Sequence, residues 1–425
     1  MRVCHIAYKY GLEKTDGATI AATRLHKALL EHGIESHYIC VYQCESGINV
    51  YQCPNGLIRG IYRFLTKAAR CVWQWTPYRR KIYINIIPLW GIKKALARIA
   101  PDVVHVQWIN ADVTTYEQLA KLPYKIVFSL HDLFLLNAIE PYPLMDRRFI
   151  DGFCKGNSVW IERWLFGRKR KMVELLDPVF VGPSEWVCGE CRKSIIGSGH
   201  QSYVISNVIS PEFFRIPNVS AKIVSNTRRF VLIFGAHLGC ANPTKGFDDL
   251  VRALHLLPDA IKARTELRVF GESADDCEIE GVPVRFLGVV DGPCKMIDVL
   301  SDADVLAFPS RAETQGMIKI EAMLCGLPVV AFARSACADG IFHGKSGWIA
   351  DNDDIQGFAN GIVYFFNFWE QGNIKAVRDA TIAHAKGLYS SDCIIKSLKQ
   401  VYENLGRELI RDDIRKLKGD VAKGV

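Results

Sequence analysis

Short apolar runs alternate with helical stretches along most of the chain, and this alternation constrains the fold more than any other feature. In the first half, the runs cover 3–7, 35–41, 103–107, 125–130 and 179–182. After a break, six more runs cover 230–234, 267–270, 284–287, 305–308, 329–331 and 348–350. Strands that alternate with helices form parallel sheets with right-handed crossovers. The pattern therefore predicts an α/β protein with two doubly wound sheets.

A break in the alternation between 206 and 226 marks a domain boundary. Turn-forming pairs such as Ser210-Pro211 and Pro217-Asn218 punctuate it, and little periodic pattern survives there. A chain of 425 residues is too long for one hydrophobic core. We therefore predict an N-terminal domain over 1–206 and a C-terminal domain over 207–390. The remaining segment, 391–425, has apolar residues on one helical face, so we expect a helix that packs back toward the first domain and ends in a frayed tail.

Cysteine usage favours a reducing compartment. Fourteen cysteines are scattered without the spacing of a small disulfide scaffold, and the N-terminus has the pattern of a buried strand rather than of a secretory signal. Cys188 and Cys191 have the spacing of a redox or zinc pair, but no second Cys/His pair stands at a partner distance. No apolar stretch is long enough to span a bilayer. We expect a cytoplasmic protein with no metal and no other cofactor.

The net charge of +8 is concentrated between residues 59 and 98. Basic side chains interleave there with Ile61, Phe64, Leu65, Trp73 and Trp75. A basic, aromatic-rich surface suits an anionic membrane face or an anionic lipid-linked substrate. A solvated helix flank is the alternative interpretation. Nucleic acid is not expected as a partner, because no zinc-finger, RRM or helix-turn-helix pattern is present.

The segment 310–330 has the strongest chemical signature. It follows an apolar run, at the sheet edge where open α/β sheets bind ligands. Gly316 would let the backbone approach a ligand, and the helix after it offers free N–H groups to a diphosphate. Glu313 and Glu321 are eight residues apart, at most about 12 Å along a helix. This spacing suits a donor sugar at Glu313 and a ribose at Glu321, although each could simply be a solvated charge.

The same segment resembles the signature of the family-4 retaining glycosyltransferases of GT-B fold. It reads Glu-x7-Glu, followed by Ala-Met-x-Cys-Gly-x-Pro-Val-Val-Ala. The resemblance covers nearly the whole chain and includes His131-Asp132, Pro183-Ser184-Glu185-Trp186, the linker 205–214 and the Lys-Gly loop at 243–247. Within the family, the chain is most similar to enzymes of the colanic-acid and exopolysaccharide type. The resemblance implies two Rossmann-like doubly wound domains facing a cleft, with acceptor-side residues in the first and the nucleotide sugar bound by the second.

The resemblance also implies roles for residues of the C-terminal domain. Lys245 would neutralise the donor diphosphate at the cleft. Glu313 would face the donor sugar, and Glu321 the ribose. Gly316 and Met317 would offer backbone N–H groups to the donor. A fixed cation and helix N-termini can stabilise the charge of a leaving nucleoside diphosphate, so no metal is required.

In the N-terminal domain, the resemblance places His131 beside the donor sugar and Gly17 in a turn near the phosphates or the acceptor. Two departures from the family pattern stand out. The family usually has an Arg shortly before the Lys-Gly loop, but here the chain reads Gly-Ala-His-Leu around His237. Either His237 or Arg311 then supplies the second positive charge, or phosphate binding is weaker. The first turn lacks the usual paired glycines.

These features predict a retaining glycosyltransferase that moves a sugar from a UDP- or GDP-linked donor to a glycan or lipid-linked acceptor in polysaccharide biosynthesis. The β-phosphate is the expected base. Peripheral association with the anionic inner face of the plasma membrane would follow from the basic stretch. Two alternatives remain: a catalytically weak binding or scaffold protein on the same fold, prompted by the missing Arg, and a nucleotide-sugar 2-epimerase of GT-B fold.

Overall fold

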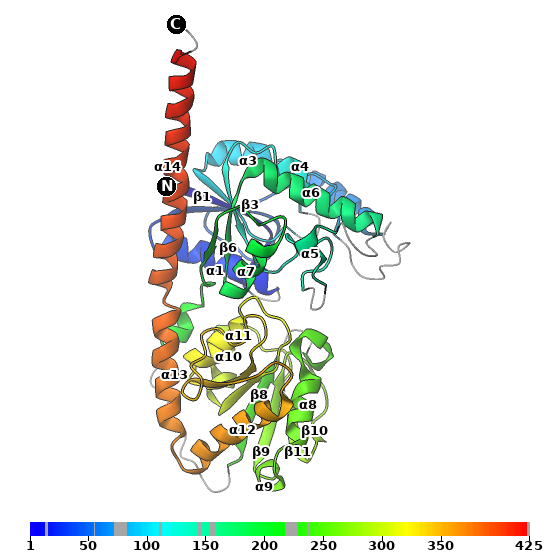
Figure 1. The fold of residues 1–425 in the computed structure, drawn as a ribbon, viewed down its shortest axis with the longest axis vertical. Coiled ribbons are helices and arrows are strands. Elements are labelled where there is room, and N and C mark those ends of the chain that lie inside the picture. Colours follow the sequence, from blue (N-terminus) through cyan, green and yellow to red (C-terminus); the bar gives the residue numbers. More distant parts are fainter. Residues whose placement is uncertain are drawn as a thin grey trace. The chain divides into compact units, whose positions relative to one another are not determined.

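The computed structural model describes residues 1–12, 16–54, 56–71, 83–109, 113–142, 146–153, 159–216, 228–235 and 239–422. The chain divides into two compact units, which are described separately (Figure 1). The N-terminal unit comprises Met1–Val208 and Ser391–Val425, and the C-terminal unit comprises Ile209–Ser390. Each unit has a seven-stranded sheet with helices on its two faces.

The sheet of the N-terminal unit is parallel throughout and has the order β3-β2-β1-β4-β5-β6-β7. Its strands are β1 (Arg2–Tyr10), β2 (Glu35–Gln43), β3 (Val50–Gln52), β4 (Val103–Val106), β5 (Lys125–Ser129), β6 (Val179–Gly182) and β7 (Ser202–Val204). The helices are α1 (Gly17–Glu31), α2 (Gly56–Cys71), α3 (Ile92–Ile99), α4 (Tyr116–Leu119), α5 (Arg148–Asp151), α6 (Trp160–Leu176), α7 (Glu185–Lys193) and α14 (Ser391–Ala422).

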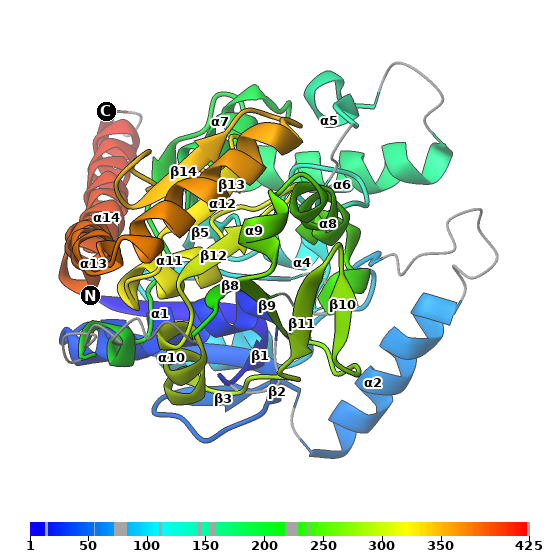
Figure 2. The ribbon, with the colours of Figure 1, turned by 90° about the horizontal axis from the view of Figure 1, so that it is seen from below.

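The sheet of the C-terminal unit has the order β10-β11-β9-β8-β12-β13-β14, which can be followed in Figure 2. Only the edge strand β10 runs antiparallel to its neighbour. The strands are β8 (Phe230–Gly235), β9 (Thr265–Phe270), β10 (Cys277–Ile279), β11 (Val282–Phe286), β12 (Val305–Phe308), β13 (Val329–Phe332) and β14 (Gly347–Ala350). The helices are α8 (Phe247–His255), α9 (Asp259–Lys262), α10 (Pro293–Ser301), α11 (Met317–Leu324), α12 (Ile355–Glu370) and α13 (Ile374–Leu388), with 3₁₀ turns η2 (Pro211–Phe214), η3 (Gly239–Ala241) and η4 (Pro243–Lys245).

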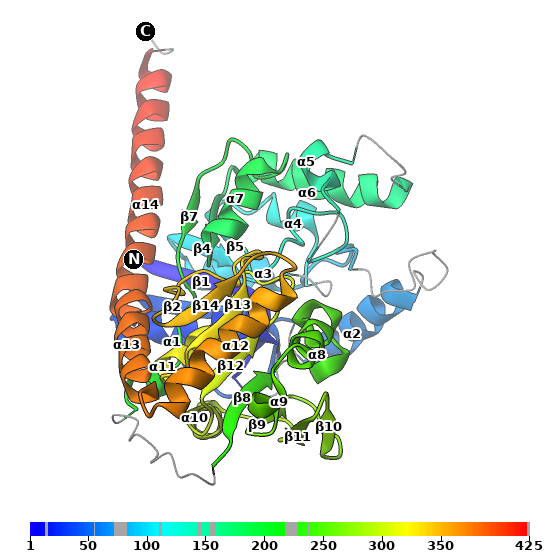
Figure 3. The same ribbon diagram turned by 60° about the horizontal axis from the view of Figure 1, so that its bottom comes forward.

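Side-chain alternation along the strands explains the layers. On β8, Phe230, Leu232 and Phe234 pack against α8 and α12, whereas Val231 and Ile233 pack against α10 and α11. Successive side chains of a strand point to opposite faces, so a strand that is apolar throughout must be covered on both sides. Figure 3 shows α12 lying across one of these faces.

Helix α14 belongs to the N-terminal unit (red in Figure 1). Apolar residues on one of its faces are buried with β4, β5 and β6: Ile394, Ile395, Leu398, Val401, Tyr402 and Leu405. The Tyr402 hydroxyl lies 2.6 Å from Nδ1 of the buried His105 on β4. No helix in the described ranges is both long enough and apolar enough to cross a bilayer.

Both sheets place candidate residues at their carboxyl edges. The strand order reverses between β1 and β4 in one sheet, and between β8 and β12 in the other. Open α/β sheets bind ligands at such switch points. The segments after β1, β4 and β5 carry Gly17, Gln107 and His131, and the segment after β12 carries Glu313.

Candidate active site

In the C-terminal unit, the structure brings together two residues that the sequence singled out separately. Lys245 ends η4, and Glu313 follows β12. The Nζ of Lys245 lies 2.6 Å from Oε1 of Glu313. Gly246 holds the loop in this position, because its φ is +69° and an added Cβ would lie 2.2 Å from the carbonyl oxygen of Pro309. The Glu313 N–H donates to Ser335 Oγ at 2.9 Å. The ion pair is therefore anchored on both sides.

Glu321 and the start of α11 lie beside this pair in the sequence. Glu313 and Glu321 are each only 7% exposed, so neither carboxylate extends into bulk solvent. Gly316 caps α11 with φ +74°, and a Cβ there would lie 2.7 Å from the ring of Phe308. Met317 opens the helix, and the first N–H groups of a helix have no acceptor in a preceding turn, although that of Lys319 donates to the Gly316 carbonyl at 2.9 Å. This helix end is therefore suited to an anion.

Arg311 is engaged by carboxylates rather than presented freely. Its guanidinium pairs with Asp248 and with the buried Asp249, the latter at 3.2 Å. Arg334 also binds Asp249, at 3.1 Å. Burial alone would raise the pKa of Asp249, but its hydrogen bonds from Arg311 and Arg334 lower that pKa overall. In this structure, the charge of Arg311 ties the segment after β12 to the first turn of α8. His237, the other candidate for a second cation, lies outside the described residues.

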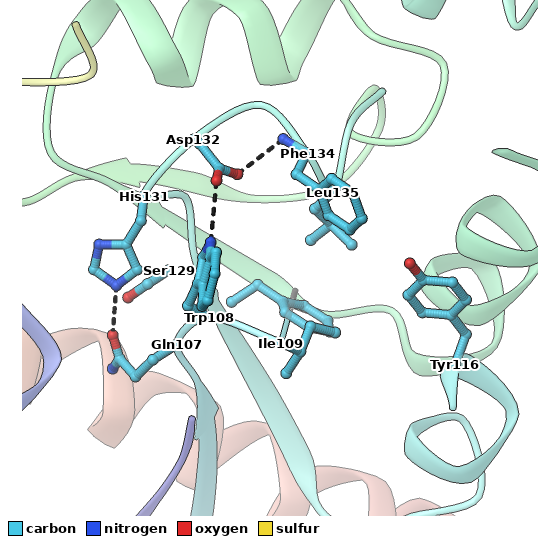
Figure 4. Close-up of a pocket in the computed structure, with 10 residues that line it drawn as sticks. Gln107, Trp108, Ile109, Tyr116, Ser129, His131, Asp132, Phe134 and Leu135 are labelled. Carbon is cyan, nitrogen blue, oxygen red and sulfur yellow. Dashed lines mark hydrogen bonds between the residues drawn. The ribbon is translucent and has the colours of Figure 1, made fainter. Parts of the chain in front are cut away.

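In the N-terminal unit, His131 lies in a polar cluster at the carboxyl edge of the sheet (Figure 4). Its Nε2 lies 2.9 Å from Oε1 of Gln107, and the Nε2 of Gln107 lies 3.0 Å from Nδ1 of His5. Because the Gln107 oxygen can only accept, His131 carries its proton on Nε2. The neighbouring Asp132 accepts from Trp108 Nε1 at 3.1 Å and from the Phe134 N–H at 2.9 Å.

The electrostatics keep His131 neutral. Burial lowers the pKa of its imidazole to about 4, while the nearby Asp16 acts in the opposite direction. Asp16 is also the N-cap of α1, where it accepts from the Thr19 N–H at 2.9 Å, and Gly17 is the first residue of that helix. A cavity of about 20 Å³ beside His131 and Trp108 is large enough for a water molecule but not for a sugar.

Comparisons with known proteins match both halves of the chain. Residues 229–367 match the profile of "Glycosyl transferases group 1", and residues 15–213 match that of "Glycosyltransferase Family 4". Together, the two matches leave out only the two ends and a short linker. The first half of the chain is therefore similar to the family-4 glycosyltransferases, and the second half to the group 1 glycosyl transferases.

Individual relatives are distant from this chain. It is 29% identical over 187 residues to D-inositol 3-phosphate glycosyltransferase 1 of Catenulispora acidiphila, a match that covers 40% of this chain and 43% of the relative. The chain spans about half the length of the curated relatives it matches.

Solved structures of similar fold cover nearly the whole chain. Sucrose-phosphate synthase from Thermosynechococcus elongatus has a TM-score of 0.66 at 15% identity, covering 95% of this chain and 98% of that one. HepE of Anabaena in complex with UDP-glucose has a TM-score of 0.58 at 15% identity, covering 95% and 100%. At such identities, the likeness concerns the fold alone. It confirms the predicted GT-B architecture of two Rossmann-like domains.

Two features of the candidate site escaped sequence reasoning. Gln107 was taken only as the end of an apolar run, yet it connects His131 to His5. Lys319 lies between the two glutamates but is fully buried, and its Nζ donates to the carbonyls of Ala336, Cys337 and Asp339 at 2.8, 3.2 and 2.6 Å. A polar residue directly after a buried strand was the available signal for Gln107. No local signal distinguishes a buried lysine from a solvated one.

The Cys188–Cys191 pair is buried on α7. Burial raises the pKa of the Cys188 thiol to about 11 and also raises that of Cys191. Thiols so held are poor thiolate ligands and poor nucleophiles. In the described part of the chain, no group of three His, Cys, Asp or Glu side chains is placed to hold a metal ion.

Proposed function

We propose that this glycosyltransferase moves a sugar from a UDP- or GDP-linked donor to a glycan or lipid-linked acceptor in polysaccharide biosynthesis, with retention at the anomeric carbon. The observation that carries the proposal is the ion pair between Lys245 and Glu313 beside the N-terminus of α11. The structures of HepE bound to UDP and to UDP-glucose support a nucleotide sugar as the donor.

The ion pair suits a donor site because each partner meets a different part of a nucleotide sugar. On donor binding, the Lys245 ammonium moves to the diphosphate, and Glu313 is released to accept hydroxyls of the sugar. The first-turn N–H groups of α11 add further positive potential. Glu321, deeper along α11, accepts the ribose hydroxyls. These interactions strengthen as negative charge grows on the leaving group, which is what lowers the barrier.

The chemical step needs a base and a leaving group. The acceptor oxygen forms a bond to the anomeric carbon as the bond from that carbon to the diphosphate breaks. The nucleoside diphosphate leaves with the electron pair, and an oxygen of its β-phosphate takes the acceptor proton. His131 accepts a hydrogen bond from the donor sugar through its unprotonated nitrogen, and Gln107 holds the ring. Gly17 and the first turn of α1 contribute the neighbouring backbone.

A panel of UDP- and GDP-hexoses tests the proposal. We expect one donor to stabilise the protein thermally and to be hydrolysed or transferred, with retention shown by NMR of the product anomer. Glu313→Gln should lower kcat by about 100-fold, the size of effect seen when one transition-state contact is lost. Glu321→Ala should mainly raise the KM for the donor. The matched control is Glu278→Ala, which removes an exposed carboxylate of the same unit.

Three results would contradict the proposal. An inverted product anomer excludes the retaining mechanism. Conversion of the donor to an epimer without any acceptor identifies a 2-epimerase instead. Thermal stabilisation without turnover by any donor favours the binding or scaffold function.

We also propose that α2 associates with an anionic membrane surface. Ile58, Ile61 and Phe64 are spaced three residues apart on α2 and are 50%, 56% and 70% exposed. Arg59, Arg63 and Lys67 lie on a neighbouring face of the same helix. Amphipathic helices with this composition bind anionic lipid surfaces. Residues 72–82, which hold further basic residues of this stretch together with Trp73 and Trp75, lie outside the described residues.

A further inference from the structure

A groove lies between α2 and the carboxyl ends of β1 and β2, within the N-terminal unit. Its volume is about 360 Å³, and its lining includes Tyr8, Tyr42, Tyr62, Arg63, Phe64 and Lys67. We call it the α2 groove. Tyr62 anchors the helix over it, because its side chain is 2% exposed and its hydroxyl donates to the Val113 carbonyl at 2.6 Å. The groove is therefore formed by packed elements and not by loops alone.

Two cations border the α2 groove without a counter-charge among the described residues. Arg63 and Lys67 lie one turn apart on α2, both exposed, and neither forms an ion pair with any described residue. The Arg63 guanidinium lies 5.3 Å from the centre of the Tyr42 ring. Like charges four residues apart on a helix repel each other. An anion placed between them would remove that repulsion and gain charge-assisted hydrogen bonds.

The walls of the groove are aromatic and lead toward His131. The rings of Tyr8 and Tyr42 meet edge to face at 5.1 Å, and Tyr8 is 6.1 Å from Trp108. The Tyr8 N–H donates to the Trp108 carbonyl at 3.2 Å. Trp108 in turn binds Asp132, the neighbour of His131. The α2 groove and the His131 cluster thus share one edge of one sheet, separated by aromatic rings on which a sugar can stack.

We propose that the α2 groove binds the phosphate group of a phosphate-bearing acceptor. The assignment rests on the proposed function, because only a transferase needs an acceptor. Arg63 and Lys67 hold the phosphate, while Tyr8 and Tyr42 support the moiety that leads toward His131. The exposed ridge of Ile58, Ile61 and Phe64 adjoins the groove, which makes a lipid-linked phosphate the expected source and a soluble sugar phosphate the other.

Binding measurements on the full chain test the assignment. The probes are phosphatidylcholine vesicles carrying a long-chain polyprenyl phosphate, vesicles of equal charge made with phosphatidylglycerol, and a soluble sugar 1-phosphate. The variant is Arg63→Gln/Lys67→Gln. Its control is Lys93→Gln/Lys94→Gln, which removes two exposed charges from α3 of the same unit. All altered side chains are exposed, so each variant should keep the wild-type Tm.

We expect the wild type and the control to bind polyprenyl phosphate vesicles more tightly than the equal-charge vesicles. Loss of two charge-assisted contacts should weaken that binding by about 10- to 100-fold in the groove variant. Tight binding of the sugar 1-phosphate, lost in the same variant, also supports a phosphate site and assigns a soluble source. Equal weakening in the control, or no weakening in the groove variant for either phosphate, overturns the inference.

The outcome of these binding measurements can be distinguished from the outcome of the donor panel. If no nucleotide sugar is turned over but the polyprenyl phosphate still binds through Arg63 and Lys67, the proposed function fails and the groove remains a phosphate site. If a donor is turned over and the groove variant binds every probe as the wild type does, only the groove assignment fails.

Discussion

At the scale of single residues, Gln107 links the His131 cluster to the interior of the N-terminal unit. Its side chain is 3% exposed and accepts from His131 while donating to His5. The amide thereby fixes which nitrogen of His131 carries the proton. Among the described residues, Nε2 of His5 has no hydrogen-bond partner, so the chain of bonds ends at a buried donor. An amide is the side chain that can serve two neutral imidazoles at once.

Replacing the Gln107 amide by a carboxylate should shift the pH dependence of kcat. In Gln107→Glu, the new carboxylate stabilises the imidazolium form of His131 and raises its pKa from about 4 by about one to three units. If transfer needs the neutral imidazole, the acid limb of the kcat profile shifts to higher pH, while the rate above pH 8 changes little. Steady-state kinetics between pH 4 and 9 measure this. An unshifted acid limb would show that His131 does not limit turnover.

Gly316 is a second position at which one residue decides local geometry. Gly316→Ala combines a φ of +74° with a contact of 2.7 Å to Phe308. Gly372→Ala is the matched control, because its φ is +73° but nothing lies within 4 Å of the new Cβ. Both variants share the strain of a positive φ, and only Gly316→Ala adds the contact with Phe308. We therefore expect Gly316→Ala to lower the free energy of unfolding by about 1–3 kcal/mol more than the control variant does. Equal losses in urea unfolding would show that Phe308 moves aside freely.

At the scale of elements, each unit uses a buried lysine to hold a loop near its sheet edge. Lys169 on α6 donates to the carbonyls of Phe134, Asn137 and Ala138 at 2.5, 2.8 and 3.1 Å. Lys319 on α11 serves the segment 336–339 in the same way. Each lysine is 0% exposed. Burial lowers the pKa of Lys319 to about 8 and depresses that of Lys169. The segment 134–138 follows His131 in the chain, and the segment 336–339 follows Ser335, which accepts from the Glu313 N–H.

Removing one of these lysines should loosen a loop and destabilise a unit. Lys169→Met leaves three carbonyls without their donor, and a buried unsatisfied group costs about 1–3 kcal/mol. We expect a lower Tm and faster hydrogen exchange between 133 and 142. Lys171→Met, an exposed position of the same helix, is the control and should change neither. If Lys169→Met has the same Tm and hydrogen exchange as its control, the three hydrogen bonds make no net contribution to stability.

At the scale of the whole molecule, the described histidines with lowered pKa values all belong to the N-terminal unit. Burial lowers the pKa of His26 to about 4 and that of His105 to about 3, with His131 at about 4 and His5 well below its usual value. His105 also joins α14 to the sheet through Tyr402. The two units therefore differ in how they respond to acid.

We predict that the N-terminal unit loses stability first on acidification. Above pH 6.5, these histidines are neutral in both the folded and the unfolded chain, so they contribute no pH dependence. Below pH 6.5, these histidines become protonated in the unfolded chain but stay neutral in the folded unit. Each histidine therefore lowers the free energy of unfolding by up to about 1.4 kcal/mol per pH unit. Hydrogen exchange at pH 7 and pH 5 should show protection lost in β1 and β4 before β8 and β12. The reverse order would contradict this.

Sequence patterns predicted the strands inside each sheet well and most of the edge strands poorly. Runs such as 179–182 and 305–308 coincide with β6 and β12, because a strand buried on both faces must be apolar throughout. The short strands β3, β7 and β10 were not predicted. Each has three residues, of which none is fully buried, so no run or alternation marks it. Only hydrogen bonding to a neighbouring strand makes these segments strands.

The residues of the candidate site also divide into those that the sequence could identify and those whose contacts it could not predict. Glu313, Gly316 and Glu321 could be selected from their spacing, because a helix start and a turn are local events. The contacts of their neighbours could not be selected in this way. Arg311 was one of two candidates for a second positive charge at the diphosphate, and its guanidinium pairs with Asp248 and Asp249. Competition among nearby carboxylates decides such pairings, and it depends on distances in space.

The sequence by itself therefore determined the two doubly wound sheets, the resemblance to glycosyltransferases and the residue types at each sheet edge, because strand burial, helix periodicity and glycine geometry act over a few residues. The tertiary structure alone decided which polar groups meet. Lys245 pairs with Glu313 across 68 residues, and Tyr402 reaches His105 across 297. Such contacts depend on strand order and helix docking, and the free energy that selects them comes from burying many side chains together.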